Sequence, residues 1–195
     1  MNFLSNLKIG TRLTLAFATI LLLAVIVGVI GLSRLSELSG DLALIRGELE
    51  PKAEKVVVVV DDVNLVAREL RNTIIFRDDQ KVAAAIETVL AARARIAQVL
   101  TELAPTITSE EGKKHLAATT DALGQYAPAQ QRFIDKVRAG EKDTAVVLLQ
   151  TELRPAQLEF MKALNGLKAL QIRLITKAAQ DGEASYQQAD RKSVV

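Results

Sequence analysis

The stretch LTLAFATILLLAVIVGVIGLS, residues 13–33, decides how this chain is organised. It carries no charged residue and is bracketed by Arg12 and Arg34. A helix of this length rises about 31 Å, which matches the hydrocarbon core of a bilayer at ~30 Å. Its end, VIGLS, lacks the small-residue A-x-A exit of a cleavable signal peptide. The sequence therefore predicts an uncleaved transmembrane helix over residues 13–33.

The charges beside this helix suggest its orientation. Lys8 and Arg12 precede it, and residues 1–32 contain no acidic side chain. Long domains translocate largely regardless of charge. We expect a cytoplasmic segment at residues 1–12, one crossing of a bacterial inner membrane, and a periplasmic domain at residues 34–190. Residues 191–195 then approach a second crossing, so we expect the sequence to be a fragment or a natural truncation.

Composition restricts the class of protein. The net charge of +2 comes from Lys8 and Arg12, and the rest of the chain balances basic against acidic residues. A nucleic-acid surface needs a strongly basic face, so we expect no nucleic-acid partner. The absence of cysteine excludes disulfides, thiolate zinc sites and cysteine nucleophiles. Few aromatic residues and no tryptophan, with abundant Ala, Leu, Glu and Lys, are typical of helical bundles.

Apolar residues beyond residue 33 recur at alternating steps of three and four, which predicts helices packed with a left-handed twist. The clearest row runs from Leu35 to Thr73, with Pro51 expected to kink its helix. Asp78 or Asp79 should cap a second helix that ends near Ala104. The segment TSEE at residues 108–111 fits a capping box for a third, and Gly140 should close that helix in a left-handed conformation.

These segments define the expected architecture. The first helix (residues 34–76) and the last (141 to about 190) are long, whereas the two between them are short. Antiparallel neighbours joined by short loops must fold back on one another. The predicted fold is therefore all-α: a transmembrane helix followed by an antiparallel up-down four-helix bundle with long first and last helices.

Several short motifs add a family resemblance. They are LKIGTRL at residues 7–13, VNLVARELRN at 63–72, SEEGK at 109–113, RAG at 138–140 and ELRPAQ at 152–157. In this order and spacing they resemble the four-helix-bundle sensor region of bacterial methyl-accepting chemotaxis proteins. The resemblance implies a periplasmic homodimeric sensor that binds a small molecule and transmits a helix displacement across the membrane. Contacts with an adaptor and a kinase would be made only by a cytoplasmic part that this sequence lacks. Some members of that sensor family serve histidine kinases or cyclic-di-nucleotide enzymes instead.

Arg93 is the most informative single residue, because it occupies a seam position and an unpaired guanidinium in a bundle core is costly. Counting from the distal turns places Tyr126 and Arg154 at the same level, with Gln130 one turn away and Asp61 or Asp62 opposite. One interpretation is a pocket for a small carboxylate, which arginine binds bidentately. The other is a satisfied Asp–Arg network, or Arg93 reaching the rim of the bundle.

A second candidate cluster lies nearer the tip on the first helix and comprises Arg68, Arg71, Asn64 and Asn72. These arginines resemble those that bind carboxylate ligands at the dimer interface of such receptors. The alternative is an ordinary solvated helix face.

Catalytic chemistry is not indicated. The sequence shows no glycine-rich phosphate loop, no nucleophile with a base and no paired carboxylates at catalytic spacing, so we expect a non-enzyme without cofactor or metal. His115 has no companion ligand and is expected at the surface. A purely structural membrane-anchored bundle remains the competing interpretation, although it predicts an apolar core where Arg93, Tyr126 and Gln130 stand.

Overall fold

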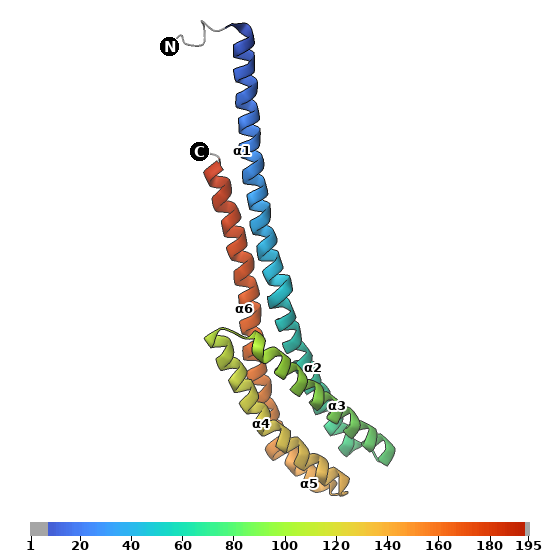
Figure 1. The fold of residues 1–195 in the computed structure, drawn as a ribbon. Coiled ribbons are helices and arrows are strands. Elements are labelled where there is room, and N and C mark those ends of the chain that lie inside the picture. Colours follow the sequence, from blue (N-terminus) through green and yellow to red (C-terminus); the bar gives the residue numbers. More distant parts are fainter. Residues whose placement is uncertain (1–7, 194–195) are drawn as a thin grey trace. The chain divides into compact units, whose positions relative to one another are not determined.

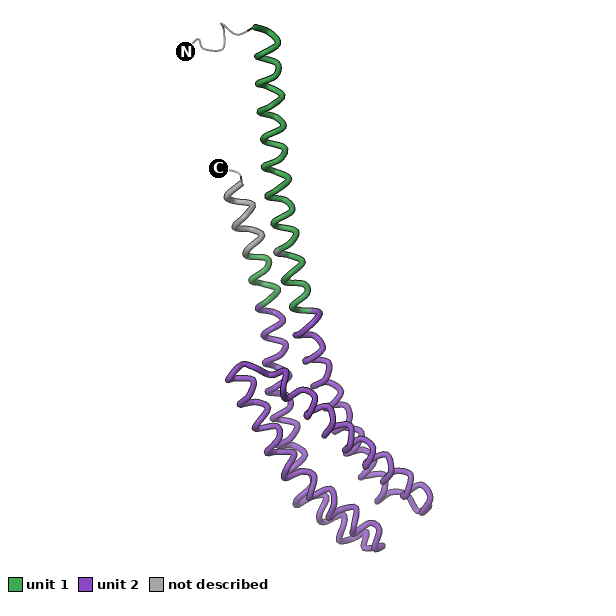
Figure 2. The backbone as a smooth tube through the Cα atoms, viewed as in Figure 1, with its two compact units in different colours: residues 1–45, 178–195 green, residues 46–177 purple. Residues whose placement is uncertain are grey.

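The computed structural model describes residues 8–193, and this part of the chain is helical without a strand. The prediction of an all-α fold is confirmed. The chain forms two compact units, residues 1–45 with 178–195, and residues 46–177 (Figure 2). Residues 1–7 of the predicted cytoplasmic segment and residues 194–195 of the predicted approach to a second crossing lie outside the described residues.

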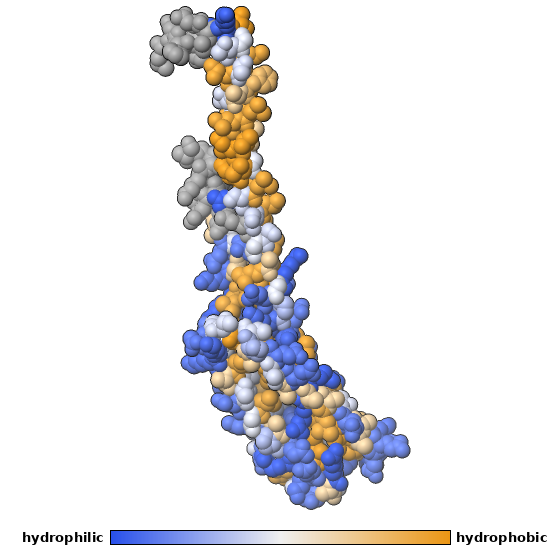
Figure 3. Space-filling view, viewed as in Figure 1, coloured by the Kyte–Doolittle hydropathy of each residue, from blue (hydrophilic) through white to orange (hydrophobic). Residues whose placement is uncertain are grey.

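The first unit contains α1 (Ile9–Leu44), a continuous helix of 36 residues. Its aliphatic side chains are exposed on all sides, for example Leu21 at 63% and Val27 at 68% (Figure 3). The hydroxyls of Thr14 and Thr19 donate to the carbonyls four residues earlier, so they need no external partner. This helix contains the predicted segment 13–33 and is long and apolar enough to cross a membrane.

The second unit is a bundle of four helical segments (Figure 1). In chain order its elements are α2 (Glu50–Ile75), α3 (Asp79–Leu103), the 3-10 turn η2 (Ala104–Thr106), α4 (Glu110–Arg138), α5 (Lys142–Leu148), the π-turn η3 (Leu149–Leu153) and α6 (Arg154–Ser193), whose residues up to Lys177 belong to this unit. The Asp78 side chain caps α3 and Gly140 has φ 76°, so these two predicted helix ends are confirmed. At the start of α4 the cap is Ser109, whose hydroxyl accepts from the Gly112 N–H, so the helix begins one residue later than the predicted capping box and has glycine where that box needs glutamate.

The core of this bundle follows the predicted row from Val56 onwards, whereas Leu35, Leu38 and Leu42, earlier in that row, are exposed. On α2 it comprises Val56, Val59, Val63, Val66 and Leu70, each without exposed surface. Facing them are Ile86, Val89, Ile96 and Leu103 of α3, Tyr126, Phe133 and Ile134 of α4, and Phe160, Leu164 and Leu167 of α6. Each large aliphatic side chain buried in this way stabilises the fold by about 1.5–3 kcal/mol before the loss of conformational entropy is subtracted.

Two π-turns interrupt the helical rows, and the sequence pattern did not predict them. The chain does not break at Pro51: it passes through η1 (Ile45–Leu49) and continues as α2. In η3 the extra residue changes which side chain faces the core. Leu153 is 2% exposed eight residues after the buried Ala145, whereas an α-helix would turn Glu152 inward. Instead, Glu152 accepts two bonds from Arg132, at 2.6 and 2.9 Å.

Candidate functional site

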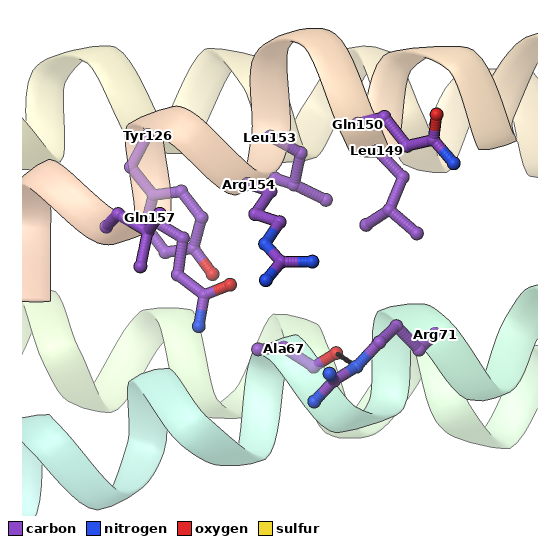
Figure 4. Close-up of a pocket in the computed structure, with 9 residues that line it drawn as sticks. Ala67, Arg71, Tyr126, Leu149, Gln150, Leu153, Arg154 and Gln157 are labelled. Atoms are coloured by element: carbon purple, nitrogen blue, oxygen red, sulfur yellow. Dashed lines mark hydrogen bonds between the residues drawn. The ribbon is translucent and has the colours of Figure 1, made fainter.

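A cavity of about 300 Å³ lies in the bundle between α2 on one side and the η3–α6 segment with α4 on the other (Figure 4). It is lined by Ala67, Arg71, Tyr126, Leu149, Gln150, Leu153, Arg154, Gln157 and Leu158. We call it the arginine cavity, because its two charged lining residues are Arg71 and Arg154. It lies at the small end of the range for ligand pockets, which suits a small molecule.

The two guanidinium groups face one another across this cavity (Figure 4). Arg71 Nε donates to the carbonyl of Ala67 at 3.0 Å, whereas the Arg154 side chain has no ion pair or hydrogen bond in the part of the chain that the structure describes. The described lining residues include no acid. Both arginines are exposed, so water screens their mutual repulsion, and an anion held between the two guanidinium groups would accept charge-assisted hydrogen bonds from each of them.

Tyr126 supplies a polar group at the inner wall. Its side chain is fully buried, its ring packs on Phe160 with centroids 5.8 Å apart, and its Oη has no hydrogen-bond partner among residues 8–193. Burial raises the pKa of Tyr126 to about 12, although the nearby Gln130 amide and the charges of Arg93 and Arg71 act in the opposite direction. The hydroxyl therefore stays protonated at neutral pH, and it can donate to a ligand only after the side chains that cover it move.

The π-turn η3 builds the outer wall with Leu149, Gln150 and Leu153. The N–H of Arg154 donates to the carbonyl of Leu149, five residues back, and Pro155 has no N–H. In an α-turn the Gln150 carbonyl would accept from the Arg154 N–H, and in a π-turn it would accept from the N–H of residue 155. Here the first N–H is used by Leu149 and the second does not exist, so neither donates to Gln150.

The predicted site residues separate into three groups. Arg71, Tyr126 and Arg154 meet in the arginine cavity. Arg68 and Asn72 lie elsewhere, because both bind Glu69: Arg68 Nε donates to Oε1 at 3.2 Å and Asn72 Nδ2 donates to Oε2 at 3.0 Å.

Arg93 and Gln130 form the third group. They line a separate cavity of about 230 Å³ between α3 and α4. Arg93 is half-buried and donates to Gln131 Oε1 at 3.1 Å, while the buried seam position belongs to its neighbour Ala92. The predicted acidic partner from the first helix, Asp62, instead accepts two bonds from Arg95, at 2.6 and 3.1 Å. Gln130 is 1% exposed and its Oε1 has no partner among residues 8–193.

Sequence reasoning missed the two glutamines of the arginine cavity. Gln150 lies four residues before Arg154 and Gln157 three residues after it, and both spacings place side chains on one helix face. Once Arg154 was selected, this spacing could have identified both glutamines, although the widening of the helix at η3 could not have been foreseen.

The donor set favours binding over metal chemistry. Within residues 8–193, no cluster of three or more His, Asp or Glu side chains has a geometry suited to a metal ion. The arginine cavity instead combines two guanidiniums, a phenolic hydroxyl, two amides and aliphatic walls from Leu149, Leu153 and Leu158. This set can hold a small anion and bond its other polar atoms.

Comparison with known proteins gives one positive result. A family model described as a four helix bundle sensory module for signal transduction matches residues 6–186. The search of curated proteins found no match.

Proposed function

We propose, from the premise that this chain belongs to the four helix bundle sensory modules for signal transduction, that its sensory step is the binding of a small organic acid in the arginine cavity. The observation that carries the proposal is the pairing of Arg71 and Arg154 across one cavity whose described lining includes no acidic side chain.

The chemistry of the lining favours a carboxylate. A guanidinium matches a carboxylate with two parallel hydrogen bonds, and two of them can accommodate a ligand with two acid groups. Tyr126 and the amide N–H groups of Gln150 and Gln157 would donate to further oxygen atoms. Binding would also give Tyr126 Oη the partner that it lacks, and this adds to the affinity because an unpaired buried hydroxyl is costly.

We further propose that the signal leaves the site along α6. Arg154 and Gln157 stand in the first turn of this helix, so a ligand that holds them acts directly on its position. A ligand shifts a conformational equilibrium only if it contacts the two states differently. In a chemotaxis receptor, that difference would appear as a small helix displacement across the inner membrane from a periplasmic homodimer. A histidine kinase or a cyclic-di-nucleotide enzyme could receive the same displacement.

The test uses the full chain in lipid nanodiscs and isothermal titration with succinate, L-malate, L-aspartate and the uncharged succinamide. We expect at least one of the acids to bind and succinamide not to bind. A charge-assisted bond contributes about 1.5–3 kcal/mol, so Arg154→Ala and Arg71→Ala should each weaken binding by roughly 10- to 150-fold.

Arg77→Ala is the matched control, because Arg77 is exposed in the turn between α2 and α3 and lines none of the cavities described above. Circular dichroism should show unchanged helicity in all three variants. Binding of an acid that survives both cavity substitutions, or an affinity for succinamide equal to that for succinate, would refute the proposal.

A further inference from the structure

The two π-turns of the chain share a sequence pattern. The segment IRGELEP at residues 45–51 and the segment LQTELRP at 149–155 both read aliphatic-x-x-Glu-Leu-x-Pro. In each, the first five residues are the π-turn, and the proline follows two residues after its end. π-turns are rare and occur frequently at functional sites. The same local motif, a π-turn followed two residues later by proline, therefore occurs twice in the described chain.

The proline explains why the helix widens into a π-turn at both positions. Because proline has no N–H, the carbonyl four residues before it loses its α-helical donor, which concerns Gly47 in the first turn and Thr151 in the second. The second turn forms a wall of the arginine cavity. The first turn also borders a cavity, of about 400 Å³, which we call the lysine cavity. It is lined by Gly47, Glu48, Pro51, Lys52 and Lys55 with Pro105, Thr106 and Thr108 from the connection between α3 and α4.

The chemistry of the lysine cavity differs from that of the arginine cavity. Its lining carries two ammonium groups, Lys52 and Lys55, and one carboxylate, Glu48. Lys52 Nζ lies 3.6 Å from Glu48 Oε2, which is a long pair between residues one helical turn apart and contributes little. Lys55 pairs more closely with Glu102 outside the cavity, at 2.8 Å. Lys52 is therefore the cation with which a ligand carboxylate can pair in place of Glu48.

The remaining walls are mainly apolar, with the Thr108 hydroxyl as an exposed polar group. Pro51 and Pro105 provide rigid hydrocarbon surface, and the aliphatic stems of the two lysines extend it. The Thr106 hydroxyl already donates to the Leu103 carbonyl at 2.7 Å, so it presents mainly its methyl group. Gly47 lines the cavity, and an added Cβ there would meet nothing within 4 Å.

We propose that the lysine cavity is a second ligand site, for a small monocarboxylate with an apolar body such as an aromatic or short aliphatic acid. The carboxylate binds Lys52 and displaces Glu48 towards solvent, while the apolar body lies between Pro51 and Pro105. This site shares no lining residue with the arginine cavity, and its ligand class does not depend on what that cavity binds.

The test uses the full chain in lipid nanodiscs and the photoreactive probe 4-(trifluoromethyl-diazirinyl)benzoic acid. On irradiation the probe loses N₂, and its carbene inserts into a neighbouring bond that mass spectrometry can locate. We expect labelling within residues 47–55 and 105–108 that excess benzoate suppresses. The double variant Lys52→Gln/Lys55→Gln should reduce this labelling by about tenfold or more.

Three further variants keep the test decisive. Gly47→Leu retains both lysines but adds a large side chain to the lining, and it should reduce labelling to a similar extent. Arg154→Ala and the control Lys113→Gln/Lys114→Gln, on the exposed side of α4, should leave the labelling unchanged. Labelling confined to residues 13–33, labelling only around Arg154, or labelling that benzoate does not suppress would each overturn the proposal. Acid binding that survives Arg154→Ala and Arg71→Ala, with labelling here intact, would refute the proposed function alone.

Discussion

Replacing Tyr126 with Phe should stabilise the ligand-free bundle and weaken the binding of the acid that we propose for the arginine cavity. The Tyr126 hydroxyl is buried without a partner among residues 8–193, and a polar group in that position costs about 1–3 kcal/mol. The ring itself packs on Phe160 and would keep its place. Removing the oxygen should therefore raise the free energy of unfolding by about 1 kcal/mol, the lower end of that cost.

For the bundle at residues 46–177, 1 kcal/mol corresponds to a rise in Tm of roughly 4 °C. Urea titration followed by circular dichroism, with the full chain in nanodiscs, should show a higher midpoint at unchanged slope. If Tyr126 donates to a bound acid, the same substitution should weaken binding by roughly 2- to 10-fold, the value of one neutral hydrogen bond. Stability and affinity would thus move in opposite directions.

Thr119→Val is the matched control for this experiment. The Thr119 hydroxyl is equally buried but donates to the His115 carbonyl at 2.9 Å, so its removal should destabilise the bundle by about 1 kcal/mol. A destabilised Tyr126→Phe variant would mean that the hydroxyl has a partner in the empty bundle. That result would refute our account of the cavity as a place with an unmet donor.

Three other outcomes follow from the structure. The pKa of Tyr126 is raised from 10.0 to about 12, so the unfolded chain loses this proton at a lower pH than the folded chain does. The free energy of unfolding should therefore be constant with respect to this group below pH 10 and fall between pH 10 and 12. In alkaline urea titrations Tyr126→Phe should remove about 2 kcal/mol of that fall. Gly112→Ala should lower Tm because its Cβ would come within 2.6 Å of a neighbouring side chain. Gly124→Ala, with open space around it, should raise the free energy of unfolding by about 0.5–1 kcal/mol and so raise Tm. Lys142→Met removes the bond from Nζ to the Phe76 carbonyl at 2.6 Å, so hydrogen exchange should accelerate at residues 72–79 with little change in global stability.

The bundle core could be predicted because burial in helices follows a short period. The row through Val56, Val63 and Leu70 is fully buried as its spacing predicts. Helix ends were also readable where one side chain determines them, as with the Asp78 cap and the left-handed Gly140. Each of these features depends on residues close together in the sequence.

The candidate site was less predictable because it depends on how faces of different helices meet. Arg93 fits the spacing of a seam, yet the buried residue is Ala92, and the long arginine stem carries its charged group to the flank. Arg71 was assigned to a separate cluster, whereas the structure places it opposite Arg154. The π-turn at η3 is a main-chain effect connected with Pro155, and a pattern of apolar residues carries no information about it.

The extra residue in η3 allows the wall of the arginine cavity to change without a change in the core packing. Deleting Thr151 would bring Leu153 seven residues after Ala145, so an ordinary α-helix could keep the same leucine inside and leave all of α6 in register. The wall of the arginine cavity would contract, while the packing below it would stay as it is. Gain or loss of a single codon at this position can therefore reshape the arginine cavity while the helix that follows keeps its register.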